Sequence, residues 1–124
     1  MNPFQSVYDS IGESKIRTLC HYFYLNVDQN AELRKLYPED LKPAEERLCL
    51  FLIQVFGGPT TYSEKRGHPR LRMRHLKWEI DSKMRNHWLN AMLSAMDQVT
   101  METQTRELMM GYFIKVAEHM INHD

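Results

Sequence analysis

His75 stands apart among the six histidines that provide candidate metal ligands. It follows Leu71 by four residues, so in a short helix opened by His68-Pro69 the two side chains would share an apolar face. An imidazole on such a face can bind a transition metal, although it is more often a hydrogen-bonded core residue. The sequence contains no His-Glu-x-x-His motif and no Cys-x-x-Cys pair, so a zinc site of the usual kind is not expected.

The segment that carries His75, residues 57–80, is long and basic. Loops beyond ~12–15 residues without structure are uncommon in compact domains, so a further group should hold this one in place. Its cations could form a solvated surface or bind phosphate, but the net charge of zero disfavours a nucleic-acid partner. The cationic side chains are Lys65, Arg66, Arg70, Arg72, Arg74 and Lys77, with Arg47 nearby in a predicted helix.

Four stretches show the spacing of helices with one buried face, at residues 16–27, 44–55, 84–99 and 108–120. No run alternates with period two for long enough to predict a sheet. Pro43 suits the first turn of the second helix, and Gly57-Gly58 should end it. Asp81 or Ser82 could cap the third helix and Thr100 the fourth. The sequence therefore predicts an all-α fold in a single domain spanning residues 1–124.

Composition excludes several classes of protein. The chain has 124 residues, 43% of them hydrophobic, with 16 basic and 16 acidic side chains. It has two cysteines, too few for a disulfide framework. The first residues lack the features of a signal peptide, and no apolar run approaches the ~20 residues that span a bilayer. We therefore expect a cytoplasmic protein with no membrane partner.

The stretch from Gly57-Gly58-Pro59 to Met73-Arg74-His75 closely resembles the signature of group II truncated haemoglobins. The resemblance covers essentially the whole chain. It implies a truncated globin fold, a two-over-two helical sandwich in which the four predicted helices correspond to the family's B, E, G and H helices. Further matches are Phe23-Tyr24, Leu36-Tyr37-Pro38-Glu39-Asp40, Ala44-Glu45-Glu46-Arg47-Leu48, Phe51-Leu52 and Trp88-Leu89.

The resemblance also implies a cofactor, haem b (iron protoporphyrin IX), with His75 as the proximal iron ligand. The carbonyl of Leu71 is the expected acceptor for the other ring nitrogen of His75. On the distal side, Tyr24, Tyr37 and Trp88 would donate hydrogen bonds to a bound ligand, beside the small Ala44 and the apolar Leu48. The side chains expected to contact the cofactor are Arg47, Phe51, Tyr62, Arg66, His68, Leu71 and Arg74.

Three functions follow as expectations. The first is reversible binding of O2, CO or NO, for oxygen transport, storage or sensing. The second is an enzyme that uses the haem for nitric oxide dioxygenation or peroxide reduction, supported by a separate reductase, although Ala44 cannot act as a general acid. The third is a helical interaction module without haem. The sequence leaves open whether the protein is a monomer or a homodimer.

Overall fold

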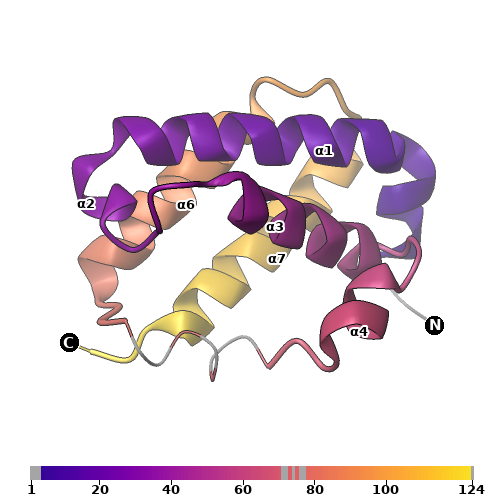
Figure 1. The fold of residues 1–124 in the computed structure, drawn as a ribbon. Helices are drawn as coiled ribbons and strands as arrows, with labels where there is room; N and C mark the ends of the chain where they lie inside the picture. Colours follow the sequence, from indigo (N-terminus) through magenta and orange to yellow (C-terminus); the bar gives the residue numbers. More distant parts are fainter. Residues whose placement is uncertain (1–3, 71–72, 74, 76–77, 124) are drawn as a thin grey trace.

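The computed structural model describes residues 4–70, 73, 75 and 78–123, and contains no strand among them. The helix α1 packs against α3 and α6, and α6 packs against α7, so two helix pairs form the sandwich that the sequence predicts (Figure 1). No helix in this part of the chain is long and apolar enough to cross a membrane. The helices are α1 (Gln5–Gln29), α2 (Ala31–Arg34), α3 (Lys42–Val55), α4 (Thr61–Arg66), α6 (Ser82–Met96) and α7 (Thr103–Met120).

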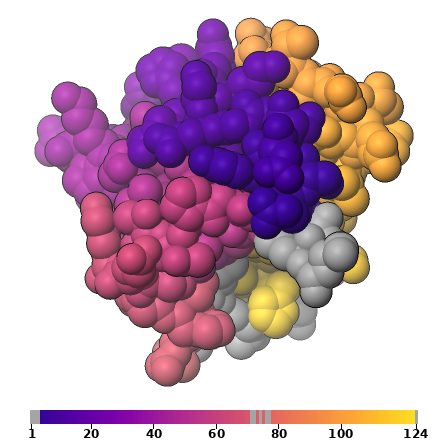
Figure 2. Space-filling view, turned by 90° about the vertical axis from the view of Figure 1, so that its right-hand side faces the viewer, coloured from indigo at the N-terminus to yellow at the C-terminus, as the bar shows by residue number. Residues whose placement is uncertain are grey.

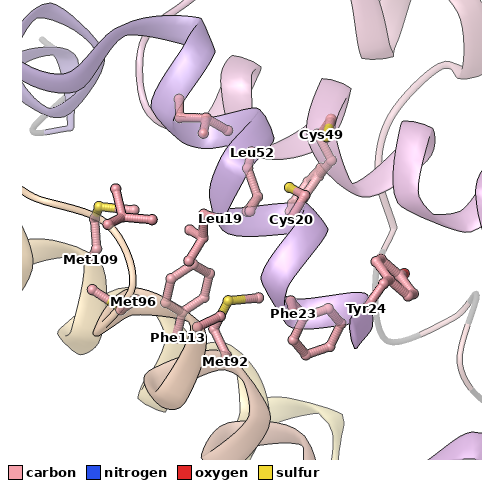
Figure 3. Packing of buried hydrophobic residues seen from close by; sticks show 14 of the residues in the cluster. Leu19, Cys20, Phe23, Tyr24, Cys49, Leu52, Met92, Met96, Met109 and Phe113 are labelled. Carbon is pink, nitrogen blue, oxygen red and sulfur yellow. The ribbon is translucent and has the colours of Figure 1, made fainter. Parts of the chain in front are cut away.

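The core lies where α1 crosses the other long helices (Figure 3). One face of α1 is fully buried because its apolar residues recur at helical spacing. Each fully buried large side chain contributes ~1.5–3 kcal/mol relative to an exposed one. The largest side chains in this core include Leu19 and Phe23 of α1, Leu52 of α3, Met92 and Met96 of α6, and Met109 and Phe113 of α7.

Gly12 breaks α1 into two parts. Its backbone has φ 74° and ψ 173°, a non-helical conformation that residues with a Cβ rarely adopt. The part before Gly12 packs Val7 and Ile11 into the core, and the part after it carries Phe23 and Tyr24. The predicted helix over residues 16–27 is therefore the part of α1 after Gly12, and a shorter helical part from Gln5, which the sequence did not indicate, precedes it.

The glycine pair after α3 allows the start of α1 to lie directly on this turn. Figure 2 shows the N-terminal part of the described chain, in indigo, lying against the part coloured magenta to pink. A Cβ on Gly57, whose φ is 104°, would lie 2.6 Å from Gln5 Cα, and a Cβ on Gly58 would lie 2.5 Å from the Tyr8 ring. The Tyr8 amide donates to the Phe56 carbonyl at 3.0 Å. This close contact fixes the end of α3 as the sequence predicts.

Two of the predicted helix starts are confirmed and one is wrong. Pro43 lies in the first turn of α3, and the Asp81 carboxylate accepts a hydrogen bond from the Met84 amide at 2.8 Å at the start of α6. Thr100, however, does not cap the fourth helix. That helix begins at Thr103, after the extended Glu102, and has no side-chain cap, because residues 100–102 lie outside the helix.

The basic segment is more regular at its start than the sequence suggests. It contains α4, which the sequence analysis missed. The Gln54 side chain holds α4 against α3, donating to Ser63 Oγ at 2.7 Å and accepting from the Ser63 amide at 2.9 Å. A helix does not open at His68-Pro69, because Arg70 has a left-handed φ of 45°. Met73 and His75 have helical backbone beyond that break.

Candidate functional site

A cavity of about 800 Å³ lies between the two helix pairs. This volume is within the ~300–1,000 Å³ typical of pockets for small molecules and cofactors. Most of its walls are apolar. The end of α1 contributes Phe23 and Tyr24, the chain before α3 contributes Leu36, Tyr37 and Pro38, and the remaining walls come from α3, α4, α6, α7 and the residues around His75.

Three polar aromatic side chains meet at one side of this cavity: Tyr24, Tyr37 and Trp88. The rings of Tyr24 and Tyr37 pack edge to face at a centroid distance of 5.6 Å. Phe23, one residue before Tyr24, packs against Trp88 at 5.4 Å. In Figure 3, Tyr24 lies on the side of the cluster away from Met92 and Met96. Residues from three separate segments are thereby brought together as the resemblance implies.

Both phenols remain protonated near neutral pH. Burial, followed by the nearby Tyr37, raises the pKa of Tyr24 far above its ordinary value. Burial also raises the pKa of Tyr37 to about 12, an effect partly offset by hydrogen bonds from Trp88 and Tyr24. Because an indole N–H can only donate, Tyr37 is the acceptor in its bond with Trp88. The site therefore presents neutral hydrogen-bond donors and no phenolate.

The helix α3 forms an apolar wall of the cavity beside these donors. Ala44, Leu48 and Phe51 are spaced at i, i+4 and i+7, so they face the cavity together. Ala44 and Phe51 are buried and Leu48 is half-buried. Tyr62 of α4 is buried against Phe51, with ring centroids 5.3 Å apart. The wall thus contains a methyl group, at Ala44, close to the tyrosine pair.

His75 lies in the wall of the same cavity and is half-buried. The ring of Trp78 packs against it at a centroid distance of 5.2 Å and an angle of 58°. The Trp78 amide donates to the His75 carbonyl at 3.1 Å. Leu71 and Arg74, which the sequence also assigns to this site, lie outside the described residues.

Arg47 and Arg66 form a cationic part of the cavity rim, and both are exposed. They come from α3 and from the last turn of α4, which the Gln54 contacts bring together. His68 is exposed and is not among the residues that line the cavity. Its Nδ1 accepts a hydrogen bond from the Arg70 amide at 3.2 Å.

Comparison with protein-family models identifies the family. The model described as "Bacterial-like globin" matches residues 6–122. The chain belongs to the bacterial-like globin family. Haem-based binding of diatomic gases is what this family implies, and the all-α sandwich is its shortened fold.

Individual relatives place this globin among the group II truncated haemoglobins. Group 2 truncated hemoglobin YjbI of Bacillus subtilis is 38% identical over 119 residues, covering 96% of this chain and 90% of the relative. The haemoglobin structure from Chloroflexus aurantiacus has a TM-score of 0.92 and 44% identity, covering 94% of this chain and 98% of that one. A truncated oxygen-avid haemoglobin structure from Bacillus subtilis has a TM-score of 0.90 and 38% identity over 94% and 98% of the two chains.

The cavity of this globin fits a haem on its own chemistry. Its volume and apolar walls suit a planar macrocycle, and His75 offers an imidazole from the wall. Arg47 and Arg66 at the rim suit the two carboxylates of the macrocycle.

Much of the cavity wall opposite α3 consists of residues that the sequence did not assign to the site. Arg85 also lines the cavity, and it forms an ion pair with Glu118. Its position three residues before Trp88, on the same face of α6, was the available signal. Most of the other unassigned lining residues belong to helical stripes of apolar residues. Such a stripe predicts a buried face but does not indicate whether that face meets a core or a cavity. These other lining residues are Trp78, Ile80, Met84, Tyr112, Phe113, Val116, Ala117 and Met120.

Proposed function

We propose that this globin binds haem b through a ring nitrogen of His75 and holds oxygen or another diatomic ligand tightly and reversibly. The observation that carries the proposal is the composition of one cavity wall. A single imidazole and three neutral hydrogen-bond donors line the same apolar space. When bound, the haem supplies an iron centre with a coordination position for the ligand.

Tyr37 is the residue we assign as the principal donor to the ligand. Tyr24, Tyr37 and Trp88 line the same part of the cavity, the Tyr24 and Tyr37 rings are in contact, and, against the larger effect of burial, Trp88 and Tyr24 both lower the pKa of Tyr37. We infer from this that Tyr37 accepts from both. Its own hydroxyl proton is then left to donate into the cavity. Accepting two bonds polarises this hydroxyl and strengthens it as a donor. A neutral donor stabilises partial negative charge on a ligand without placing a formal charge in an apolar site.

Ala44 supports binding over bond cleavage. Its methyl group can neither donate a hydrogen bond nor transfer a proton, so the α3 side provides no general acid. Leu48 excludes water from the space next to it, which keeps the hydrogen bonds of the tyrosines strong. These residues therefore favour holding a ligand intact, with Tyr24, Tyr37 and Trp88 setting its release rate.

The rim residues would hold the cofactor in one orientation. We assign Arg47 and Arg66 to the haem propionates, with Tyr62 as a neutral partner. Guanidinium groups form charge-assisted hydrogen bonds with carboxylates, often with two bonds in parallel. Phe51 fixes the Tyr62 ring, so it positions the hydroxyl as well as covering the macrocycle.

Two further observations agree with this proposal. A structural relative from Bacillus subtilis is described as oxygen-avid, which matches a site with several donors.

Cys20 and Cys49 are free thiols, as is usual in a reducing compartment, and we therefore propose that the protein works in the cytoplasm.

The release rate of oxygen tests the proposal. The oxygenated ferrous protein is mixed with excess carbon monoxide, and the replacement is followed in the Soret region. We expect release at least about tenfold slower than in a Tyr24→Phe/Tyr37→Phe double variant, the effect of ~1.4 kcal/mol in the bound state. Equal release rates in the two proteins would overturn the proposed donor role.

A further inference from the structure

The chain after α7 contacts the segment that follows His75. Asn122 lies two residues beyond Met120, the last residue of α7, and its side chain faces residues 78–80. Figure 1 shows the C-terminus beside the approach to α6, close to this segment. Asn122 lies 42 positions from Ile80 and 44 positions from Trp78 in the sequence, yet the three residues are held together at one end of the cavity.

Four hydrogen bonds make this contact. The Asn122 side-chain amide donates to the Trp78 carbonyl at 3.0 Å, and its oxygen accepts from the Ile80 amide at 2.9 Å. The Ile80 carbonyl accepts from the backbone amides of Asn122 at 2.8 Å and His123 at 3.1 Å. The Asn122 amide group therefore uses both its donor and its acceptor on one short stretch of backbone.

That stretch is in direct contact with His75. The Trp78 amide bonds to the His75 carbonyl, and the Trp78 ring packs on the imidazole. Trp78 and Ile80 also line the cavity, so a shift of either would move the wall beside the histidine. Ile80 is buried, whereas residue 79 is exposed and Trp78 is half-buried. The bonds to Asn122 therefore act together with the packing of Ile80 to fix this stretch.

We propose that Asn122 is a positioning residue for His75, which it orients by fixing residues 78–80 to the end of α7. This inference rests on the proposed role of His75 as the iron ligand. It assigns a role in cofactor binding to a polar residue that touches neither the cavity nor the imidazole. Groups that orient a metal ligand typically change metal affinity by about 10- to 100-fold when removed.

The test compares Asn122→Ala with a matched control, Asn26→Ala. Asn26 is also a part-buried asparagine that donates to a backbone carbonyl, that of Ala91, at 2.9 Å, and it does not line the cavity. In the haem-free proteins, amide hydrogen exchange is measured for peptides covering residues 73–80. We expect about tenfold faster exchange there in Asn122→Ala and no change in Asn26→Ala.

The haem-loaded proteins provide the spectroscopic readout. The iron–histidine stretching band in resonance Raman spectra of the reduced protein should shift or broaden in Asn122→Ala, with haem loss about tenfold faster. If Asn122→Ala does not fold, Asn122→Asp decides. Its carboxylate keeps an acceptor for the Ile80 amide and for the neighbouring His123 ring, but it replaces the donor to the Trp78 carbonyl with a charged oxygen. We expect the same changes in the Asp variant.

Two results would overturn this inference while leaving the proposed function intact: exchange and Raman bands in the Asn122 variants identical to wild type, or equal changes in Asn26→Ala. A wild-type protein without any iron–histidine band would instead remove the proposed function itself.

Discussion

The rings of Tyr24 and Tyr37 meet edge to face with centroids 5.6 Å apart, although one residue lies on α1 and the other beyond α2. The contact places two hydroxyl groups at one side of the cavity. The two phenols are not equivalent, because their interaction raises the pKa of Tyr24 and lowers that of Tyr37, beside the larger effect of burial on each. We propose that Tyr24 orients Tyr37 and that Tyr37 donates to the ligand.

The first prediction concerns this inequality. Tyr37→Phe should speed oxygen dissociation about tenfold relative to wild type, because a donor worth ~1.4 kcal/mol in the bound state is lost. Tyr24→Phe should have a smaller effect. Tyr22→Phe is the matched control, since Tyr22 lies on α1 next to His21 and not on the cavity. A larger effect from Tyr24→Phe would reverse the assigned direction of the hydrogen bonds.

Much of the fold could be predicted from the sequence because the apolar residues of the long helices keep helical spacing. The glycine pair at 57–58 and Asp81 also carry local signals that the structure confirms. The short helix α4 was missed because its stability comes from the Gln54 side chain on α3, a contact outside the helix itself. Local pattern contains no information on such a partner.

The site could be predicted only where a family pattern supplied it. Ten of the assigned residues line the cavity, namely Tyr24, Tyr37, Ala44, Arg47, Leu48, Phe51, Tyr62, Arg66, His75 and Trp88. The wall from α7 could not be assigned, since Val116 and Ala117 look the same in sequence whether they face a core or a cofactor. Asn122 was missed because its partners lie 42 and 44 residues away.

The second prediction concerns alkaline pH. The pKa of Tyr37 is about 12 in the folded protein, against ~10 in an unfolded chain. Because the pKa is higher in the folded state, the protonated hydroxyl stabilises the protein at any pH below the pKa of the unfolded chain. This contribution is lost as pH rises from ~10 towards 12. In urea unfolding of the haem-free protein, Tyr37→Phe has no hydroxyl to titrate at this position, so its free energy of unfolding should fall less than that of wild type over this interval. We expect a difference of about 1 kcal/mol, a value reduced for solvent screening because the Tyr37 residue is only half-buried. An identical loss in both proteins would contradict the burial of this hydroxyl.

The third prediction concerns the two cysteines, which lie on the facing sides of α1 and α3 (Figure 3). A hydrogen bond from Cys20 and, more weakly, the charge of Arg17 lower the pKa of Cys49, whereas the same bond and burial raise the pKa of Cys20. Iodoacetamide should therefore label Cys49 first. Cys20→Ala should move the pH midpoint of Cys49 labelling upwards, and Cys20→Ser, which keeps a donor, should move it less. Labelling of Cys20 before Cys49 would show the opposite polarity.

The fourth prediction concerns the cationic rim. Arg47→Ala should speed transfer of haem to a scavenger globin by about two- to fivefold, since an exposed ion pair contributes up to ~1 kcal/mol. Arg17→Ala is the control, because Arg17 is bound to Glu13 and Glu46 away from the cavity. Equal rates of haem loss in Arg47→Ala and Arg17→Ala would show that Arg47 does not bind a propionate.

Whether His75 binds the haem iron is decided by the absorption spectrum of the reduced protein with carbon monoxide. His75→Ala is compared with His68→Ala, a histidine of the same segment that does not line the cavity. We predict that wild type and His68→Ala retain haem and give the Soret band of a histidine-ligated carbon monoxide complex, whereas His75→Ala loses haem or lacks this band. Full haem retention and an unchanged spectrum in His75→Ala would contradict the account.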